Sequence, residues 1–192
     1  IPQRKGDPIV IDTDEHPRAS TTLEGLAKLK PVVTAEGTVT AGNASGINDG
    51  AAAVLIASEQ AIQEYQLKPR AKIIASTAVG VEPRIMGFAP APAIKKLLKQ
   101  ANLTIEQMDV IELNEAFAAQ ALAVTRDLGL ADDTTQVNPN GGAIAIGHPL
   151  GASGARLVTT ALNQLEQTGG TYALCSMCIG VGQGIAMIIQ RV

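Results

Sequence analysis

The chain has 192 residues, a formal net charge of −3, 46% hydrophobic residues and only 2% aromatic residues. This length allows a well-buried core in one or two domains, and the scattered lysines and arginines argue against nucleic acid as a partner. No apolar run approaches the ~18 residues that span a bilayer, and no apolar signal core follows the first residues, so we expect no membrane segment and a cytoplasmic or organelle-matrix location.

The N-terminal third of the chain is predicted to be largely extended. Residues 1–20 are polar, contain three prolines and show no helical period, so they are expected to form an arm without a core. A short helix follows, because Thr21 opens a capping-box sequence. Turn-forming residues then lead into the apolar run 51–57, which we predict to be a buried strand. Ser58 is expected to cap a helix that ends near Leu67.

From residue 71 onward, strands alternate with helices. The predicted strands are 71–79, 109–113, a short stretch near Val137, 171–178 and 184–190, and the predicted helices are 92–101, 114–128 and 152–167. This alternation indicates an α/β fold with a mixed, mostly parallel five-stranded sheet that is covered by helices on both faces and ends in a hairpin.

Three polar or reactive side chains are predicted to share one edge of this sheet. Asn114 follows one strand, His148 lies in a strand-to-helix loop and Cys178 ends another strand. Ligands of such sheets bind beyond the carboxyl ends of the strands. A functional site is therefore expected there, although Asn114 and Glu115 are also explained as ordinary residues at a helix start.

The loop at residues 138–154 contains five glycines around its single histidine. Glycines let a backbone turn tightly and approach a ligand, and Pro149 restricts the direction in which His148 is presented. An alternative interpretation is a glycine-rich connector with an incidental histidine. The loop matches neither the nucleoside-triphosphate fingerprint nor the dinucleotide fingerprint, so kinase and dehydrogenase functions have little support.

The two cysteines, Cys175 and Cys178, are too few for a disulfide framework. A thiolate at Cys178, directly before the glycine turn, is suited to act as a nucleophile, a base or a metal ligand, whereas the alternative is an inert buried thiol. The Cys-x-x-Cys spacing is a weak metal or redox signal because no second pair exists. Strand alternation places the two side chains on opposite faces, so Cys175 is assigned to the core.

Three motifs resemble the C-terminal signatures of the thiolases, in order and at family-like separations: Asn114-Glu-Ala-Phe, the run from Asn140 to Gly154 and Cys178-Ile-Gly-Val-Gly. An upstream motif, Gly42-Asn-Ala-Ser-Gly-Ile-Asn-Asp-Gly50, resembles a fourth signature, most like that of the acetyl-CoA acetyltransferases. The resemblance covers nearly the whole chain but only about half of a thiolase, because the cysteine that becomes acylated in the family has no counterpart here. Val181 stands where the family often has glycine.

The resemblance implies a thiolase-like fold with three domain portions. Residues 1–47 would end the loop domain that covers coenzyme A, residues 48–70 would complete the N-terminal domain, and residues 71–192 would form the C-terminal domain. A homodimer or homotetramer is implied for the complete protein, with the missing N-terminal thiolase half as a partner of this chain.

The resemblance also assigns roles to individual residues. His148 would activate the acylated cysteine, Cys178 would be the base for carbon–carbon bond formation, and Asn114 and Gly180 would supply oxyanion donors. The implied coenzyme A contacts are Ser45, Arg18, Ala116 and Phe117. Coenzyme A thioesters are the implied substrates, with no covalently bound cofactor and no metal.

Three functions remain open at this point. The first is an acetyl-CoA C-acetyltransferase, which interconverts two acetyl-CoA with acetoacetyl-CoA and CoA, and this chain alone is expected to be inactive. The second is a 3-ketoacyl-CoA thiolase for the longer chains of fatty-acid β-oxidation. The third is a non-catalytic acyl-CoA or lipid-binding protein of thiolase-like fold, which the presence of Asn114, His148 and Cys178 disfavours.

Overall fold

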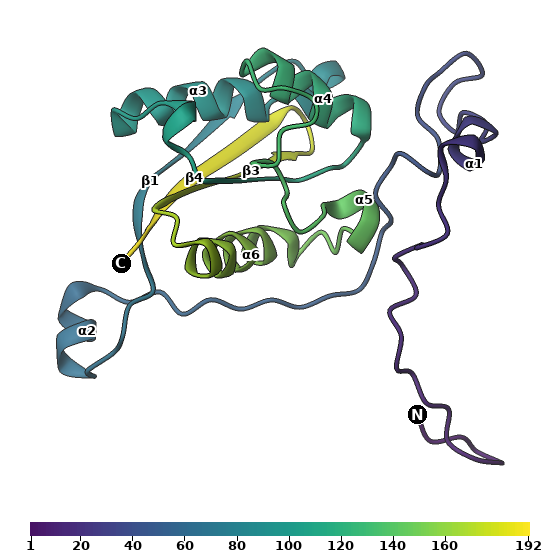
Figure 1. The fold of residues 1–192 in the computed structure, drawn as a ribbon, viewed down its shortest axis with the longest axis horizontal. Helices are drawn as coiled ribbons and strands as arrows, with labels where there is room; N and C mark the ends of the chain where they lie inside the picture. Colours follow the sequence, from purple (N-terminus) through teal and green to yellow (C-terminus); the bar gives the residue numbers. More distant parts are fainter.

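A four-stranded mixed sheet forms the centre of the molecule in the computed structural model, which describes all 192 residues (Figure 1). Its order is β1-β4-β3-β2. The β1/β4 and β3/β4 pairs are antiparallel, and the β2/β3 pair is parallel. The strands are β1 (Ala71–Gly80), β2 (Val110–Leu113), β3 (Tyr172–Ile179) and β4 (Gln183–Arg191).

The mixed sheet and the C-terminal β3/β4 hairpin are confirmed, and β4 is the one strand that runs against the other three, but the predicted count of five strands is wrong. The stretch near Val137 makes one parallel bridge to Ile111 and does not continue as a fifth strand. The next residue, Asn138, has a φ of 46°, which turns the backbone away from the strand direction. The side chain of Asn138 takes the place of the backbone hydrogen bonds of a fifth strand. Its Oδ1 accepts the N–H of Leu113, and its Nδ2 donates to the C=O of Leu113, each at 2.9 Å.

Helices cover both faces of the sheet, as predicted. In Figure 1, α3 and α4 lie on one face, while α5 and α6 lie on the other. The helical elements are α1 (Leu23–Ala27), α2 (Glu59–Glu64), the 3₁₀ turns η1 (Pro83–Phe88) and η2 (Ile105–Gln107), α3 (Pro90–Ala101), α4 (Ala118–Asp127), α5 (Ala143–Ile146) and α6 (Ser153–Thr168). No helix is long and apolar enough to cross a bilayer.

The core consists of two apolar layers, one on each side of the sheet. On the α3 face, Ile94 and Leu97 are fully buried and pack in one cluster with Leu174 of β3. On the α6 face, Leu157 packs in a second cluster that includes Cys175. Neighbouring residues of β3 thus pack into opposite layers, which confirms that Cys175 belongs to the core. By the same alternation, the side chain of Cys178 points away from the cluster that contains Cys175.

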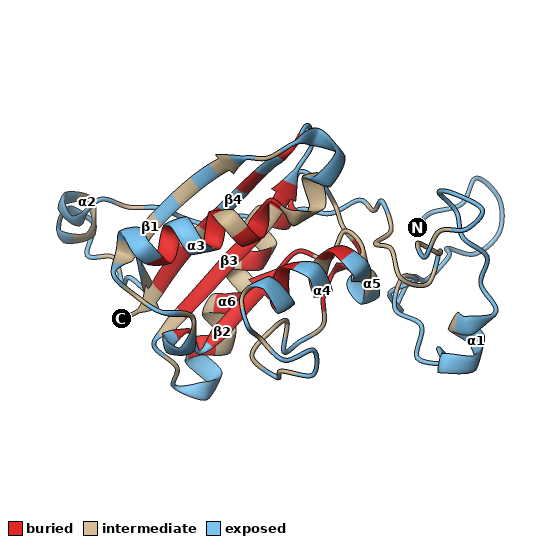
Figure 2. Cartoon of the chain, turned by 90° about the horizontal axis from the view of Figure 1, so that it is seen from above, coloured by how far each residue is buried: buried red, intermediate tan, exposed pale blue.

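The segment before residue 71 lies outside this core. None of its residues is buried, and Figure 2 shows it in the colours of exposed and intermediate residues. The N-cap of α1 is Thr22, one residue after the predicted Thr21, because the Thr22 hydroxyl accepts the Gly25 N–H at 3.1 Å. Ser58 caps α2 as predicted, by accepting the N–H of Ala61 at 3.1 Å.

The prediction of a buried strand at residues 51–57 is wrong for this structure. The run is extended but has no strand partner, and Leu55 and Ile56 are 85% and 72% exposed. An extended segment becomes a strand only when a neighbouring strand satisfies its N–H and C=O groups. No strand of the structure pairs with residues 51–57, so the apolar side chains of this run remain uncovered.

Candidate active site

Three segments that are far apart in the sequence converge beyond the carboxyl ends of β2 and β3. Ala44 forms an antiparallel bridge with Phe117, and Ile47 forms a parallel bridge with His148. The segment at residues 43–48 therefore connects the loop after β2 to the histidine loop. This convergence agrees with the expectation that loops at the carboxyl ends of strands build the site.

Three of the four predicted coenzyme A contacts lie together in this region. The N–H of Ser45 donates to the carbonyl of Ala116 at 3.0 Å, and its hydroxyl donates to the same oxygen at 3.3 Å. Phe117 follows directly and carries the bridge to Ala44. Arg18 is the exception, since it is exposed on the N-terminal arm and contributes only its backbone carbonyl to a local turn.

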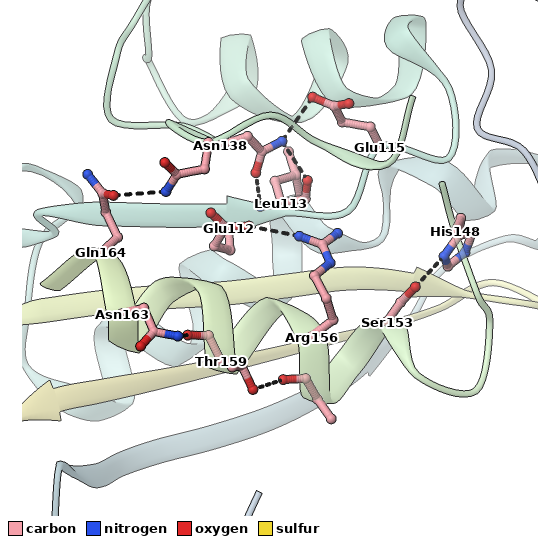
Figure 3. Close-up of polar contacts among 12 residues, drawn as sticks. Glu112, Leu113, Glu115, Asn138, His148, Ser153, Arg156, Thr159, Asn163 and Gln164 are labelled. Atoms are coloured by element: carbon pink, nitrogen blue, oxygen red, sulfur yellow. Dashed lines mark hydrogen bonds and ion pairs between the residues drawn. The ribbon is translucent and has the colours of Figure 1, made fainter. Parts of the chain in front are cut away.

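The ring of His148 is held through both of its nitrogens, and Figure 3 shows the contact with Ser153. Nδ1 lies 2.6 Å from the Ser153 hydroxyl, and Nε2 lies 3.4 Å from the side-chain nitrogen of Asn114. The Ser153 hydroxyl donates its proton to the carbonyl of Pro149 at 3.0 Å. With the Ser153 proton directed to Pro149, Nδ1 carries the proton that reaches Ser153, and the unprotonated Nε2 faces the amide nitrogen of Asn114.

The surroundings of His148 favour its neutral form. Burial lowers the pKa of its imidazole, and the nearby positive charge of Arg156 lowers it further. Both effects penalise the imidazolium ion. A histidine with a lowered pKa and an unprotonated Nε2 is suited to accept a proton at neutral pH.

Asn114 does not cap a helix, which corrects the predicted helix start at that residue. The α4 helix begins at Ala118, and residues 114–117 form a loop. The Asn114 backbone N–H donates to Ser176 of β3 at 3.0 Å, and its side chain is fully buried. Its Oδ1 has no hydrogen-bond partner in the protein. A buried acceptor of this kind is a place for a bound water or a ligand donor.

Glu115 ties the loop after β2 to the histidine loop. One carboxylate oxygen accepts a hydrogen bond from Asn138 at 2.9 Å, and the other accepts the N–H of Ile144 at 3.2 Å. A Cβ on Gly142 would collide with this carboxylate. Sequence reasoning missed the contacts of Asn138, although its place as the first residue of the glycine-rich loop marked a turn residue.

Cys178 is not joined to this hydrogen-bond network. The ring nitrogens of His148 bond to Asn114 and Ser153, and Cys178 stands at the end of β3 with 7% of its surface exposed. Burial raises the pKa of its thiol, partly offset by a backbone hydrogen bond. Gly180 follows in the exposed hairpin turn, where its carbonyl accepts a bond from Gln183 at 3.2 Å.

A buried ion pair behind His148 was not predicted from the sequence. Arg156 of α6 contacts the carboxylate of Glu112 of β2 at 3.2 Å, and Glu112 is completely buried (Figure 3). Burial raises the pKa of Glu112 to about 7, against the opposing effect of Arg156. Burial also raises the pKa of Cys175, the strand neighbour of Glu112, and the negative charge of Glu112 raises it further. A carboxylate inside the apolar strand 110–113 was the available signal.

Comparison with known proteins identifies the family of this site. A model of the thiolase N-terminal domain matches residues 1–60, and a model of the thiolase C-terminal domain matches residues 67–191. The chain belongs to the thiolase family, whose members are acyltransferases that use coenzyme A thioesters as substrates.

Individual relatives carry different substrate names. The chain is 87% identical over its full length to a β-ketoadipyl-CoA thiolase of Acinetobacter baylyi, of which it covers 48%. A Bacillus anthracis acetyl-CoA acetyltransferase structure matches all of the chain and 48% of its own length, with 44% identity and a TM-score of 0.92. Human mitochondrial 3-ketoacyl-CoA thiolase in complex with CoA matches 95% of the chain and 46% of its own length, with 48% identity and a TM-score of 0.86. The chain thus spans about half the length of the relatives it matches.

Proposed function

We propose that the complete protein is a thiolase that cleaves a 3-oxoacyl-CoA with coenzyme A, and that this chain supplies the two proton-transfer residues. The observation that carries the proposal is His148, whose neutral ring presents an unprotonated Nε2 beside Asn114. The assignment of residues 1–47, 48–70 and 71–192 to three thiolase domain portions is part of the proposal.

His148 and Cys178 act in successive steps of the proposed reaction. His148 Nε2 accepts the proton of a cysteine thiol supplied by the rest of the protein, and the thiolate attacks the 3-oxo carbon. The bond between C2 and C3 then breaks, the acyl group stays on sulfur, and the Cys178 thiol protonates C2 of the departing acetyl-CoA. The Cys178 thiolate then takes the proton of the coenzyme A thiol, which displaces the acyl group from the cysteine, and the released cysteine thiolate takes back the proton held by His148. In the reverse direction the Cys178 thiolate removes a proton from C2 of acetyl-CoA.

Asn114 and Gly180 are proposed to stabilise the negative oxygens that develop. The unpartnered Oδ1 of Asn114 fits a role as the anchor of a water that donates to the enolate oxygen, together with a protonated His148. The N–H of Gly180 is proposed to serve the oxyanion of the acyl-cysteine. Removal of one such donor typically costs ~3 kcal/mol of transition-state stabilisation.

Coenzyme A is proposed to contact Ser45, Ala116 and Phe117, with Arg18 near the nucleotide end. The hydrogen bond of Ser45 to Ala116 and the bridge of Ala44 to Phe117 already bring the first three residues together, so a pantetheine arm can bind along them. Arg18 has weaker support because it lies on the exposed arm. The complete protein is proposed to include the missing N-terminal half and to assemble as a homodimer or homotetramer.

For the substrate, we favour β-ketoadipyl-CoA over acetoacetyl-CoA. The relative that is 87% identical over the whole chain carries the β-ketoadipyl name, whereas the acetyl-CoA acetyltransferase structure is 44% identical. Acetyl-CoA acetyltransferase activity remains the second candidate, because its structure superposes with a TM-score of 0.92. The ratio of kcat/KM for the two 3-oxoacyl-CoA substrates decides between the two functions.

The test of catalytic roles uses the complete protein. His148→Ala should abolish acylation by radiolabelled acetyl-CoA, whereas Cys178→Ala should become labelled but fail to form acetoacetyl-CoA. Equal labelling of both variants and the parent would show that His148 is not the activating base. The 192-residue chain alone should not turn over acetoacetyl-CoA, since it lacks the acylated cysteine, and turnover that depends on Cys175 or Cys178 would refute this division of roles.

A further inference from the structure

The second histidine of the chain, His16, connects the N-terminal arm to the histidine loop. Its Nε2 lies 3.3 Å from the carbonyl oxygen of Ile144, at a sequence separation of 128 residues. Its Nδ1 lies 3.3 Å from the side-chain nitrogen of Asn48. One half-buried ring therefore contacts two segments that flank the site from different parts of the chain.

Asn48 continues this contact to the backbone of His148. Its Oδ1 accepts the backbone N–H of His148 at 3.1 Å, and the same N–H also approaches the carbonyl of Gly46 at 3.1 Å. The chain of contacts thus runs from Ile144 through His16 and Asn48 to His148. Both of its ends are backbone groups at two points of one loop.

The backbone groups at the ends determine the direction of every bond between them. The N–H of His148 can only donate, so the Asn48 oxygen faces it and the Asn48 amide nitrogen faces His16. The carbonyl of Ile144 can only accept, so His16 carries its proton on Nε2 and accepts from Asn48 through Nδ1. The arrangement is fully paired for neutral His16 in this one tautomer.

Two glycines provide the space for these side chains. A Cβ on Gly46 would lie 2.6 Å from Cε1 of His16, and a Cβ on Gly147 would lie 2.5 Å from Oδ1 of Asn48. Gly147 also has a φ of +92°, which few other residues adopt. The close approach of His16 and Asn48 is therefore built into the backbone on both sides of the contact.

We propose that His16 and Asn48 are positioning residues that hold the backbone of His148 so that its Nε2 points toward the reacting thiol. Ser153 fixes the ring of His148 from one side, and the His16–Asn48 pair fixes its main chain from the other. The proposal rests on the proposed function, in which His148 is the activating base. A base displaced by about 1 Å can lose up to ~100-fold in rate.

The test compares His16→Ala with His16→Gln in the complete protein. Alanine removes both contacts, whereas the glutamine amide can still donate to Ile144 and accept from Asn48. His16→Ala should lower the acylation rate by roughly tenfold with little change in the KM for coenzyme A thioester. Loss of one supporting hydrogen bond should also speed hydrogen exchange of the His148 amide by about fivefold, and His16→Gln should restore both quantities.

Three results would overturn the proposal. These are unchanged acylation and exchange in His16→Ala, a change in KM alone, and a His16→Gln variant that behaves like His16→Ala despite an equal melting temperature. Failure of the proposed function is recognised separately, because His148→Ala would then retain acylation. Hydrogen exchange at His148 would still report whether His16 holds the loop.

Discussion

The Glu112–Arg156 pair gives the sharpest prediction about stability and pH. Glu112→Gln keeps the shape of the side chain and an oxygen that can accept from Arg156, but it removes the titrating proton. Burial raises the pKa of Glu112 from its ordinary 4.5 to about 7 in the folded protein. Between these two values the folded state holds a proton that the unfolded state has already released.

The sign follows from proton linkage. Because the folded state binds more protons, this group makes the free energy of unfolding fall as pH rises from about 4.5 through 7. A shift of that size corresponds to about 3 kcal/mol, since each pKa unit is worth ~1.4 kcal/mol. Glutamine lacks this dependence. The free energy of unfolding of Glu112→Gln minus that of the parent should therefore be about 2.5 kcal/mol larger at pH 8 than at pH 5.

Urea unfolding of the complete protein at pH 5, 6, 7 and 8 measures this difference directly. The other titrating groups are common to both proteins, so they cancel in the comparison. Glu166→Gln is a matched control of opposite sign, because its half-exposed pairing with Arg70 lowers the pKa of Glu166. A difference between parent and Glu112→Gln that stays constant with pH would refute the buried, proton-binding state of Glu112.

Two further predictions concern the site and the hairpin turn. Ser153→Ala should slow acylation by about fivefold, because Nδ1 of His148 loses its acceptor, and radiolabelled acetyl-CoA measures that rate in the complete protein. An unchanged rate would show that Ser153 does not set the tautomer. Val181→Gly should raise the free energy of unfolding by ~1 kcal/mol, since Val181 is exposed with a φ of 68°, a conformation costly for any side chain. Val181→Ala keeps the Cβ and should gain less by the same denaturation assay.

Local sequence patterns predicted the elements whose determinants lie within one segment. The spacing of Ile94, Leu97 and Leu98 identified α3, and all three side chains are buried. Ser58 identified the start of α2, and the glycine turn identified the β3/β4 hairpin. Periodicity and capping are properties of neighbouring residues, so they can be read without knowing the tertiary structure.

Features that depend on distant partners were missed or wrongly assigned. Asn114 looked like a helix cap, but its backbone bonds to β3 and its side chain meets His148. Glu112 and Arg156 are 44 residues apart, and only the packing of α6 on β2 brings them together. His16 lies on an arm without periodicity, so no local pattern marked its contacts at separations of 32 and 128 residues.

Two of the five glycines in the glycine-rich loop have a structural reason that the sequence did not indicate. Their missing Cβ atoms leave room for side chains of the protein itself. Gly142 leaves room for Glu115, and Gly147 leaves room for Asn48. Both neighbours hydrogen-bond to backbone N–H groups of the same loop. The absence of these two Cβ atoms therefore lets Glu115 and Asn48 approach the loop closely enough to hydrogen-bond to the backbone of Ile144 and His148.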